Sequence, residues 1–517
     1  MIDSWLLAKL TNENLPHYGL EELAWEYLHF LPWKYKTRDY VADFSQAPPE
    51  LVSSRCEMDA WASYRLTRHL LPTINWPAIQ FVVRLAGVLD RIQMAGQRLD
   101  TDRLALEANP AQFGSMARRE QKLARRLGRQ LTERSGDVFD PIYLTNKHRL
   151  KTVLFDQLAW PVLEHTAKSH EPKLDKFVLQ QMIQERPGEK GLCQLLLKWG
   201  QTEKLLSTYV RSFLTKQRDG FLYPNLFLGT TTWRRAGNNP NPQNLPRWAK
   251  QFIVSRFPDG WIGSHDFDQL EPRIMMDQAG QGDILERIVG GESIYNILAV
   301  SALWGHDLHK TERPEEYKVT KQVWLGKQYR MQARKLQQTL RQLGVVMSLA
   351  EVEEIDRKVW KLMPRVKAFQ EETRKEVLET GQSVTALGIV RHLPHDGPGS
   401  PDFEHIVNEA INVKVQGPAA FITGASLILL EECFLQEAGI DYVDHVRHLW
   451  KKNFFYPLIQ NEVHDELVQD YPPGCVDLES RVGPVMINPL ALPEFQALWP
   501  NFTVPLAVHG GLAKQWR

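Results

Sequence analysis

Apolar residues recur with helical spacing over most of this 517-residue chain. The spacing and the few helix breakers predict long helices over residues 76–99, 115–133, 321–343 and 346–380, the last ending at Gly381. Strand patterns are fewer, and they predict strands within residues 260–265, 383–391 and 454–470. The pattern therefore predicts a mostly helical α+β protein with short strand insertions.

The composition is that of a large folded protein. Hydrophobic residues make up 43% and charged residues 24%, which excludes a disordered chain. No apolar run approaches the roughly 18 residues of a spanning helix, and the N-terminus does not resemble a secretory signal. The four cysteines lie far apart and form no CxxC pair, so we expect a reducing compartment and neither a disulfide framework nor structural zinc.

The charge balance of 62 basic against 62 acidic residues, taken alone, argues against a nucleic-acid partner. The charges are unevenly spread, however, because basic residues gather in residues 118–151 and 310–341. Acidic residues gather in residues 351–356 and 462–470. Such basic runs are often only solvated helix faces, but two of them in a neutral chain favour local patches that face a polyanion.

Two segments carry carboxylates beside apolar stretches. In residues 260–275 a short apolar strand precedes Asp266, Asp268 and Glu271, and in residues 458–470 a predicted hairpin tip carries Asp465. Carboxylates that end strands can bind Mg²⁺, which serves phosphoryl transfer. Alternatively, each aspartate forms a turn, and Asp268 with Glu271 forms a capping box.

Two further segments suit nucleotide binding. On a helix over residues 317–330, one face carries two cations, an apolar residue and an aromatic residue: Lys318, Lys321, Leu325 and Tyr329. This face suits a triphosphate with its base, although an ordinary amphipathic helix with snorkelling lysines has the same pattern. The Asn-rich residues 230–246, with adjacent arginines, suit phosphate and base contacts or a surface loop of turn formers.

Taken in order, these segments resemble the motifs of family A DNA polymerases, the group of bacterial DNA polymerase I and its phage relatives. DFDQLEPRI resembles DYSQIELR, KQVWLGKQY resembles KxxxFGxxYG, and LIQNEVHDELV resembles QVHDE. TWRRAGNNPNPQNLP and NEAINVKVQGPAA are similar to TGRLSSxxPNLQNIP and ERAAINxxxQGTAA. The resemblance extends over about residues 75–517.

The resemblance implies a right-hand polymerase fold: α+β, mostly helical, with thumb, fingers and a palm built on an antiparallel sheet. The implied divisions are a truncated 3′–5′ exonuclease-like remnant at 1–73, thumb at 74–213, palm at 214–276 and 406–517, and fingers at 277–405.

The resemblance also implies DNA-templated addition of dNTPs to a primer 3′ end, with two Mg²⁺ ions as cofactors. The implied catalytic residues are Asp266 and Asp465, which would also bind the metal, and Lys321. The implied dNTP-binding residues are Glu271 as the steric gate against a 2′-hydroxyl, Lys318, Leu325 and Tyr329. Primer and template would be contacted or supported by Arg234, Gln243, Asn244, Arg273, Asn412, Gln416 and His464.

The chain departs from the family pattern at several of these positions. Leu325 replaces an aromatic residue beside the sugar, which predicts weaker ribose packing rather than loss of activity. The other departures replace glycine or arginine of the family, at Tyr317, Arg330, Trp233 and Asn408.

Residues 1–73 resemble the last part of a 3′–5′ exonuclease domain. Asp59 matches its terminal metal aspartate, but Arg55 replaces a tyrosine, and the remaining carboxylate motifs would lie before Met1. One aspartate cannot assemble that metal site, so we expect no intrinsic proofreading. The resemblance shows no 5′-nuclease domain either.

Three alternatives remain open. A single-subunit RNA polymerase shares the palm, but Glu271 would block a 2′-hydroxyl. The others are a catalytically weak DNA-binding subunit of a split polymerase, and a gap-filling or lesion-tolerant repair polymerase. The expected partners are primer–template DNA and dNTPs, with a separate exonuclease polypeptide or replication accessory proteins as further candidates, and no membrane. The expected location is the cytoplasm of a bacterial or phage-infected cell.

Overall fold

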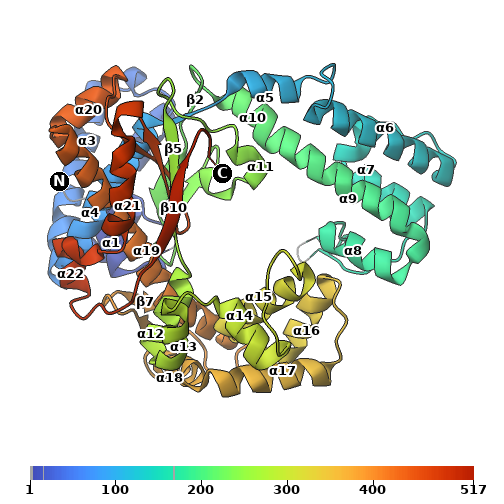
Figure 1. The fold of residues 1–517 in the computed structure, drawn as a ribbon. Coiled ribbons are helices and arrows are strands. Elements are labelled where there is room, and N and C mark those ends of the chain that lie inside the picture. Colours follow the sequence, from blue (N-terminus) through green and yellow to red (C-terminus); the bar gives the residue numbers. More distant parts are fainter. Residues whose placement is uncertain (1–3, 16, 167–168, 517) are drawn as a thin grey trace.

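The computed structural model describes residues 4–15, 17–166 and 169–516. Helices dominate, and the strands form small antiparallel sheets, so the predicted α+β class is confirmed. Figure 1 shows the elements arranged around a central opening, with the largest sheet on one side of it and helical parts on the others.

The chain begins with four helices on the outer side of the largest sheet (Figure 1): α1 (Ser4–Thr11), α2 (Leu20–Leu28), α3 (Pro49–Leu70) and α4 (Trp76–Ala95). The Asn75 side chain caps α4 by accepting a hydrogen bond from the backbone N–H of Ala78. Gly96, with φ of 69°, ends it before the predicted residue 99, since this backbone conformation favours glycine.

A helical arm extends from this part. It contains α5 (Thr101–Ala108), α6 (Met116–Ser135), α7 (Lys147–Lys151), α8 (Lys176–Glu185), α9 (Lys190–Leu205) and α10 (Ser212–Lys216). Helix α6 packs on α9 because its apolar stripe, with Leu127 and Leu131, is buried against Leu192 and Leu196. The arm therefore has a hydrophobic core of its own.

The largest sheet has four antiparallel strands in the order β10 (Val508–Ala513), β5 (Trp261–Phe267), β9 (Glu466–Tyr471) and β8 (Leu458–Val463). Helices α4 and α19 (Phe403–Ala438) pack against β8. The register pairs Asp266 on β5 with Glu466 on β9 and His509 on β10. This pairing fixes which residues of two distant segments meet at the end of the sheet.

Shorter elements lead into this sheet: β1 (Gln97–Arg98), β2 (Phe221–Leu222), β3 (Asn225–Leu228), β4 (Arg235–Asn238) and α11 (Arg247–Lys250). The four strands pair as two separate antiparallel ribbons, β1 with β2 and β3 with β4.

The helices below the sheet in Figure 1 are α12 (Leu270–Ala279), α13 (Gly282–Val289), α14 (Ile294–Leu298), α15 (Pro314–Gln328), α16 (Ala333–Gln342), α17 (Leu349–Leu362) and α18 (Pro364–Thr380). The prediction of one helix over residues 321–343 was wrong, since Arg330 takes a left-handed φ of 57° between α15 and α16. The stretch predicted over 346–380 is also two helices, because Pro364 cannot continue α17 and instead begins α18. A hairpin of β6 (Gln382–Val384) and β7 (Val390–His392) follows.

Helix α19 is the central helix of the large core. By length and composition it is the one described helix that could cross a membrane, but 83% of its most apolar stretch is buried inside the protein. A long apolar helix that is mostly buried is typical of the core of a folded protein. The chain closes with α20 (Tyr442–Lys451), α21 (Glu479–Met486) and α22 (Pro493–Leu498) before β10.

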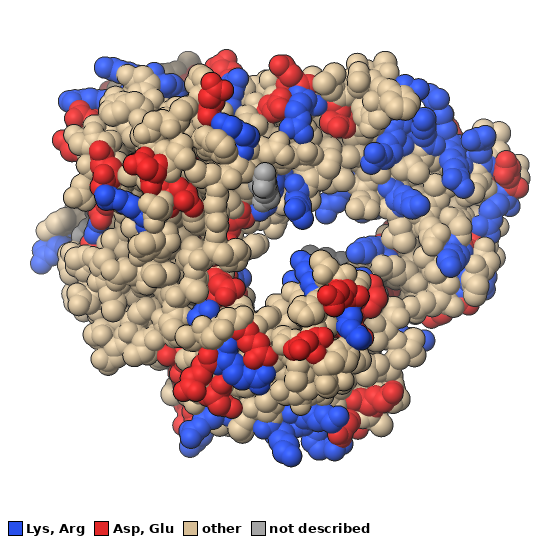
Figure 2. Space-filling model, viewed as in Figure 1, with Lys and Arg blue, Asp and Glu red and all other residues tan. Residues whose placement is uncertain are grey.

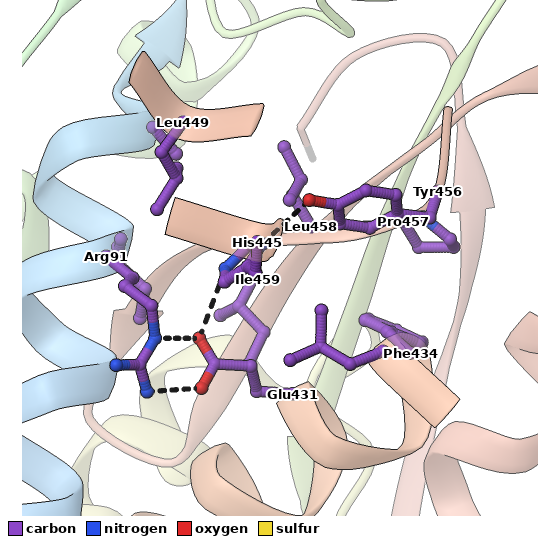
Figure 3. Close-up of a pocket in the computed structure, with 12 residues that line it drawn as sticks. Arg91, Glu431, Phe434, His445, Leu449, Tyr456, Pro457, Leu458 and Ile459 are labelled. Atoms are coloured by element: carbon purple, nitrogen blue, oxygen red, sulfur yellow. Dashed lines mark hydrogen bonds and ion pairs between the residues drawn. The ribbon is translucent and has the colours of Figure 1, made fainter. Parts of the chain in front are cut away.

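A buried ion cluster joins three helices behind the sheet (Figure 3). The guanidinium of Arg91 on α4 donates to both carboxylate oxygens of Glu431 on α19, at 2.8 and 2.6 Å. His445 on α20 lies 3.6 Å from Glu431 and shares a 2.7 Å hydrogen bond with the Tyr456 hydroxyl. Each buried charge therefore has a partner of opposite sign or a hydrogen bond.

Candidate active site

The two carboxylates predicted at strand ends lie in one cleft. Asp266 is on β5, Asp465 follows β8 at the hairpin tip, and the backbone N–H of Phe267 donates to the carbonyl of Asp465 at 3.1 Å. The cleft has a volume of about 670 Å³, and its walls include Lys204, Tyr209 and Asn244. The β5–β9 pairing thus brings together residues that are distant in the sequence.

Both carboxylates lie in surroundings that disfavour their negative charge. Burial, with Glu271 nearby, raises the pKa of Asp465 to about 7. Burial and the neighbouring Glu466 also raise the pKa of Asp266. Within the described residues, no side chain donates a hydrogen bond to either carboxylate and neither forms an ion pair. A cation bound here would therefore relieve both desolvation and repulsion.

The hairpin tip is strained. A two-residue turn, His464–Asp465, joins β8 to β9, and His464 takes a φ of 57° at its first position. Glycine is usual at this position of such a turn. Strained non-glycine residues concentrate at functional sites, which fits the placement of His464 in the cleft wall. Burial and the nearby Arg234 cation lower the pKa of His464.

Glu271 lies at the centre of a hydrogen-bond network beside the cleft. Arg234 donates to its Oε1, while the Tyr329 hydroxyl and Gln328 Nε2 both donate to its Oε2 at 3.0 Å. Gln416 on α19 in turn donates to the Tyr329 hydroxyl at 3.3 Å. Burial and the Glu271 carboxylate raise the pKa of Tyr329, which keeps its hydroxyl a donor. Four predicted residues therefore meet in one network.

The predicted nucleotide face of α15 is only partly free. Lys321 is exposed and has no partner among the residues the structure describes, whereas Lys318 pairs with Glu315 at 2.6 Å. Leu325 is 38% exposed, and Tyr329 lies just past the helix end as its C-cap. Tyr317, where the family has an arginine, packs edge-on against Tyr295.

The other predicted contact residues differ in their surroundings. Gln243 and Asn244 line the cleft, and the Asn244 carbonyl accepts from the Tyr209 hydroxyl at 3.0 Å. Arg273 is buried and donates to the carbonyls of Asp268 and Pro505 at 2.8 and 2.9 Å, so it holds backbone rather than facing the cleft. Asn412 on α19 has a buried Oδ1 without a hydrogen-bond partner in the described part of the chain.

Sequence reasoning missed a cation in the cleft wall. Lys250 pairs with Glu466 at 2.6 Å and lies 4.2 Å from the Trp516 ring centroid, and the Trp516 indole donates to Glu466 at 2.6 Å. Its one signal is its position shortly after the Asn-rich segment 230–246.

A buried ion pair beside the cleft was also missed. Arg235 pairs with Glu462, both nearly fully buried, and also donates to Thr423 and the Ala420 carbonyl. Burial lowers the pKa of Arg235 to about 9. The pair connects the residue after Arg234 to the strand that leads to the hairpin tip. Only its adjacency to the predicted residues marks it in the sequence.

Asp59 lies outside this site, on α3. The Trp33 indole donates to its Oδ1 at 2.8 Å, and Arg55 lies 3.7 Å from its Oδ2. Over the described ranges, no cluster of three or more His, Cys, Asp or Glu has the arrangement of a metal site. The cleft instead offers two carboxylates, a number with which Mg²⁺ binds when substrate phosphates and water complete its shell.

The arm carries a basic surface (Figure 2). Five exposed cations follow one side of α6 and have no partner among the described residues: Arg119, Lys122, Arg125, Arg126 and Arg129. Like charges three and four residues apart on a helix repel one another. No acidic side chain among the described residues pairs with these cations to offset the repulsion, as expected for a surface that meets a polyanion.

Comparisons with known proteins agree with this architecture. The sequence model of DNA polymerase family A matches residues 114–517. DNA polymerase I of Helicobacter pylori is 26% identical over 75% of this chain and 39% of its own length, and the thermostable DNA polymerase I of Thermus aquaticus is 26% identical over 93% and 52%. The DNA polymerase of Bacillus phage SP01 is 26% identical over 68% and 37%.

The chain thus spans about half the length, or less, of these curated relatives. A solved structure, the POL domain of Pol1 from M. smegmatis in complex with DNA primer-template and dNTP, superposes with a TM-score of 0.78 over 99% of this chain and 81% of that chain, at 21% identity. That likeness shows the polymerase fold. With the match over residues 114–517, it follows that the chain belongs to DNA polymerase family A.

Proposed function

We propose that this chain is a DNA-templated DNA polymerase that adds dNTPs to the 3′ end of a primer. The observation that carries the proposal is the meeting of Asp266 and Asp465 in one cleft, where neither carboxylate forms an ion pair with a described residue. The family match and the polymerases among the relatives support it. In the reaction, the primer 3′-hydroxyl attacks the α-phosphate of the dNTP and pyrophosphate leaves.

The residues present fit divalent metal. Two half-buried carboxylates with raised pKa values repel each other, and this repulsion favours a bound cation. We infer that Asp266 and Asp465 hold two Mg²⁺ ions. When bound, the metal supplies activation of the attacking hydroxyl and stabilisation of the leaving oxygen.

Residues around the carboxylates would bind and orient the substrates. Lys321, exposed and unpaired among the described residues, would offset charge on the leaving pyrophosphate. Glu271 would close the sugar pocket to a 2′-hydroxyl, with Leu325 and Tyr329 beside the nucleotide and Lys318 as a second cation. The primer and template would contact or depend on Arg234, Asn244, Gln416, His464, Asn412 and Arg273.

The proposed division of the chain follows the parts around the opening in Figure 1. Residues 74–213 would be the thumb, 277–405 the fingers, and 214–276 with 406–517 the palm. Residues 1–73 would be the exonuclease-like remnant. The unpaired cations of α6 support a thumb that holds the duplex through its phosphates.

Primer extension tests the function. With Mg²⁺, a primed template and dNTPs, the protein should extend the primer, and Asp266→Asn should not. Binding of the same DNA should persist in Asp266→Asn, since the basic surface lies elsewhere. Binding without Mg²⁺-dependent extension by the unaltered protein would instead indicate a DNA-binding subunit, and preference for rNTPs would indicate an RNA polymerase.

We further propose that this chain has no 3′–5′ proofreading of its own. The support is that Asp59 is bonded to Trp33 and paired with Arg55 instead of lying among other carboxylates in the described residues. A primer with a terminal mismatch should therefore stay intact with Mg²⁺ present. Degradation that persists in Asp266→Asn but disappears in Asp59→Ala would contradict this.

Partners beyond DNA and dNTPs, and a location inside a bacterial or phage-infected cell, are proposed from the relatives.

A further inference from the structure

The Glu271 carboxylate has more hydrogen-bond donors than its position in a nucleotide pocket requires. Its Oε1 accepts from Arg234, and its Oε2 accepts from the Tyr329 hydroxyl and from Gln328 Nε2, both at 3.0 Å. Three donors from two separate segments thus fix one side chain. A carboxylate held this way cannot rotate without losing charge-assisted hydrogen bonds, which are the stronger kind.

The three donors are not equally available once nucleic acid is bound. Arg234 lies on the segment proposed to contact primer and template, so phosphates or bases compete with Glu271 for its guanidinium. The two donors to Oε2, Tyr329 and Gln328, come from the end of α15 and lie outside that segment. When Arg234 turns to the primer, the carboxylate therefore depends on Tyr329 and Gln328.

Of these two donors, Gln328 is the more firmly anchored. It is the last residue of α15 and 1% exposed, and its carbonyl accepts a 3.1 Å hydrogen bond from Gln370 on α18, which also donates to the Lys327 carbonyl at 2.9 Å. Tyr329 lies beyond the helix end with a φ of −119°, followed by the left-handed Arg330. The Tyr329 hydroxyl also accepts from Gln328 Nε2 at 3.0 Å. The Gln328 amide therefore positions both the carboxylate and the hydroxyl.

We propose that Gln328 is a positioning residue for sugar selection: its side-chain amide fixes Glu271 where the carboxylate excludes a 2′-hydroxyl. The inference rests on the proposed polymerase function and deepens it. The amide itself touches neither carboxylate of the metal site, so it acts through Glu271. Loss of the amide leaves Glu271 with one hydrogen bond to Oε2, and the side chain gains freedom to move away from a ribonucleotide.

The test compares kcat/KM for a dNTP with kcat/KM for the matching rNTP on one primed template. Gln328→Leu keeps the side-chain volume and removes the donor, so the dNTP-to-rNTP ratio should fall roughly tenfold, as expected for one lost hydrogen bond to a charged group. Gln328→Glu places a second carboxylate against Glu271 and should lower the ratio further. A merely structural loss would lower both kcat/KM values together and leave the ratio unchanged.

Gln460→Leu is the matched control, because Gln460 on β8 is another fully buried glutamine and its side chain has no hydrogen-bond partner among the described residues, Glu271 included. Its ratio should stay within about twofold of the unaltered protein. An unchanged ratio in Gln328→Leu, or an equal fall in Gln460→Leu, would overturn the role of the amide while leaving the polymerase assignment in place. Absence of any dNTP incorporation by the unaltered protein would overturn both.

Discussion

Two carboxylates of this protein, Glu431 and Asp465, have opposite pKa shifts. Burial works against the charge of Glu431 behind the sheet, yet hydrogen bonds and charge from Arg91 and His445 outweigh it and lower its pKa (Figure 3). Burial and the Glu271 charge raise the pKa of Asp465 to about 7 at the cleft. Glu431 is buried and Asp465 is half-buried in the cleft wall, yet the more exposed carboxylate has the raised pKa, so the difference lies in their partners.

The comparison separates charges that hold the fold from charges that serve a ligand. The cation that balances Glu431 is Arg91 of the same protein, so removal of the Glu431 charge lowers the stability of the fold and does not affect ligand binding. Asp465 forms no ion pair with a described residue, and burial and nearby carboxylates outweigh the more distant Arg234 and Arg235, so its charge is a cost to the fold that a bound metal offsets. Substitution of carboxylate by amide at the two positions should therefore give opposite results.

The largest expected effect is the loss of activity in Asp465→Asn. We expect primer extension to fall by roughly 10³-fold or more, since the amide cannot hold a divalent ion as a carboxylate does. The melting temperature without metal, measured at pH 8, should stay equal or rise, because a half-buried charge without an ion-pair partner is removed. Asp39→Asn, an exposed carboxylate without a described partner, is the control and should change neither quantity.

Glu431→Gln should give the reverse result. Leaving the Arg91 guanidinium buried against an amide should destabilise the protein by about 3–5 kcal/mol, seen as a lower urea midpoint. Extension measured well below the melting temperature should stay close to that of the unaltered protein, because the cluster does not touch the cleft. Equal stability of Glu431→Gln and the unaltered protein would contradict a structural role for the pair.

The two carboxylates should also differ in pH dependence. Asp465 has a raised folded pKa, so its contribution to stability is present at low pH and lost as pH rises through about 7. Glu431 has a lowered folded pKa, so its contribution is present above the unfolded pKa and lost as pH falls through the folded one. Each contribution changes by up to about 1.4 kcal/mol per pH unit within its window.

Urea unfolding of the unaltered protein and of Asp465→Asn between pH 5 and pH 8 measures the first contribution. Relative to the unaltered protein, Asp465→Asn should become more stable as pH rises. Calorimetric Mg²⁺ titration should show proton release on binding at pH 6 and little at pH 8, because the ion displaces the Asp465 proton. Proton release that does not change between these pH values would mean that Asp465 is not the titrating ligand.

The sequence predicts those parts of the site that depend on short motifs. Asp266 and Asp465 follow or interrupt apolar runs that read as strands, so their place at strand ends could be predicted and their cleft inferred from resemblance. The break between α15 and α16 could not be predicted, because Arg330 adopts a glycine-like conformation that no local pattern signals. Pro364, by contrast, is a signal for a helix boundary that the broad helical pattern concealed.

The buried ion pairs could not be predicted from the sequence either, because they depend on contacts between distant segments. Arg91 with Glu431, and Arg235 with Glu462, join residues hundreds of positions apart, and each member alone looks like an ordinary surface charge. Only the packing of α19 against α4 and the sheet buries them together. Gln328 is similar, since its role depends on a carboxylate that arrives from α12.

The smallest expected effect concerns two lysines on one helix. Lys318 pairs with Glu315 at the surface, and exposed pairs of this kind contribute about 0–1 kcal/mol. Lys318→Ala should therefore change the melting temperature by less than about 1 °C in a chain of this size, and dNTP KM by no more than a few-fold. Lys321→Ala, which removes the unpaired cation three residues on, should lower kcat by roughly 10²-fold. A larger loss of kcat in Lys318→Ala than in Lys321→Ala would mean that Lys318 leaves Glu315 and binds the triphosphate. In that case the ion pairs within the protein would not identify which lysine of this helix contacts the nucleotide.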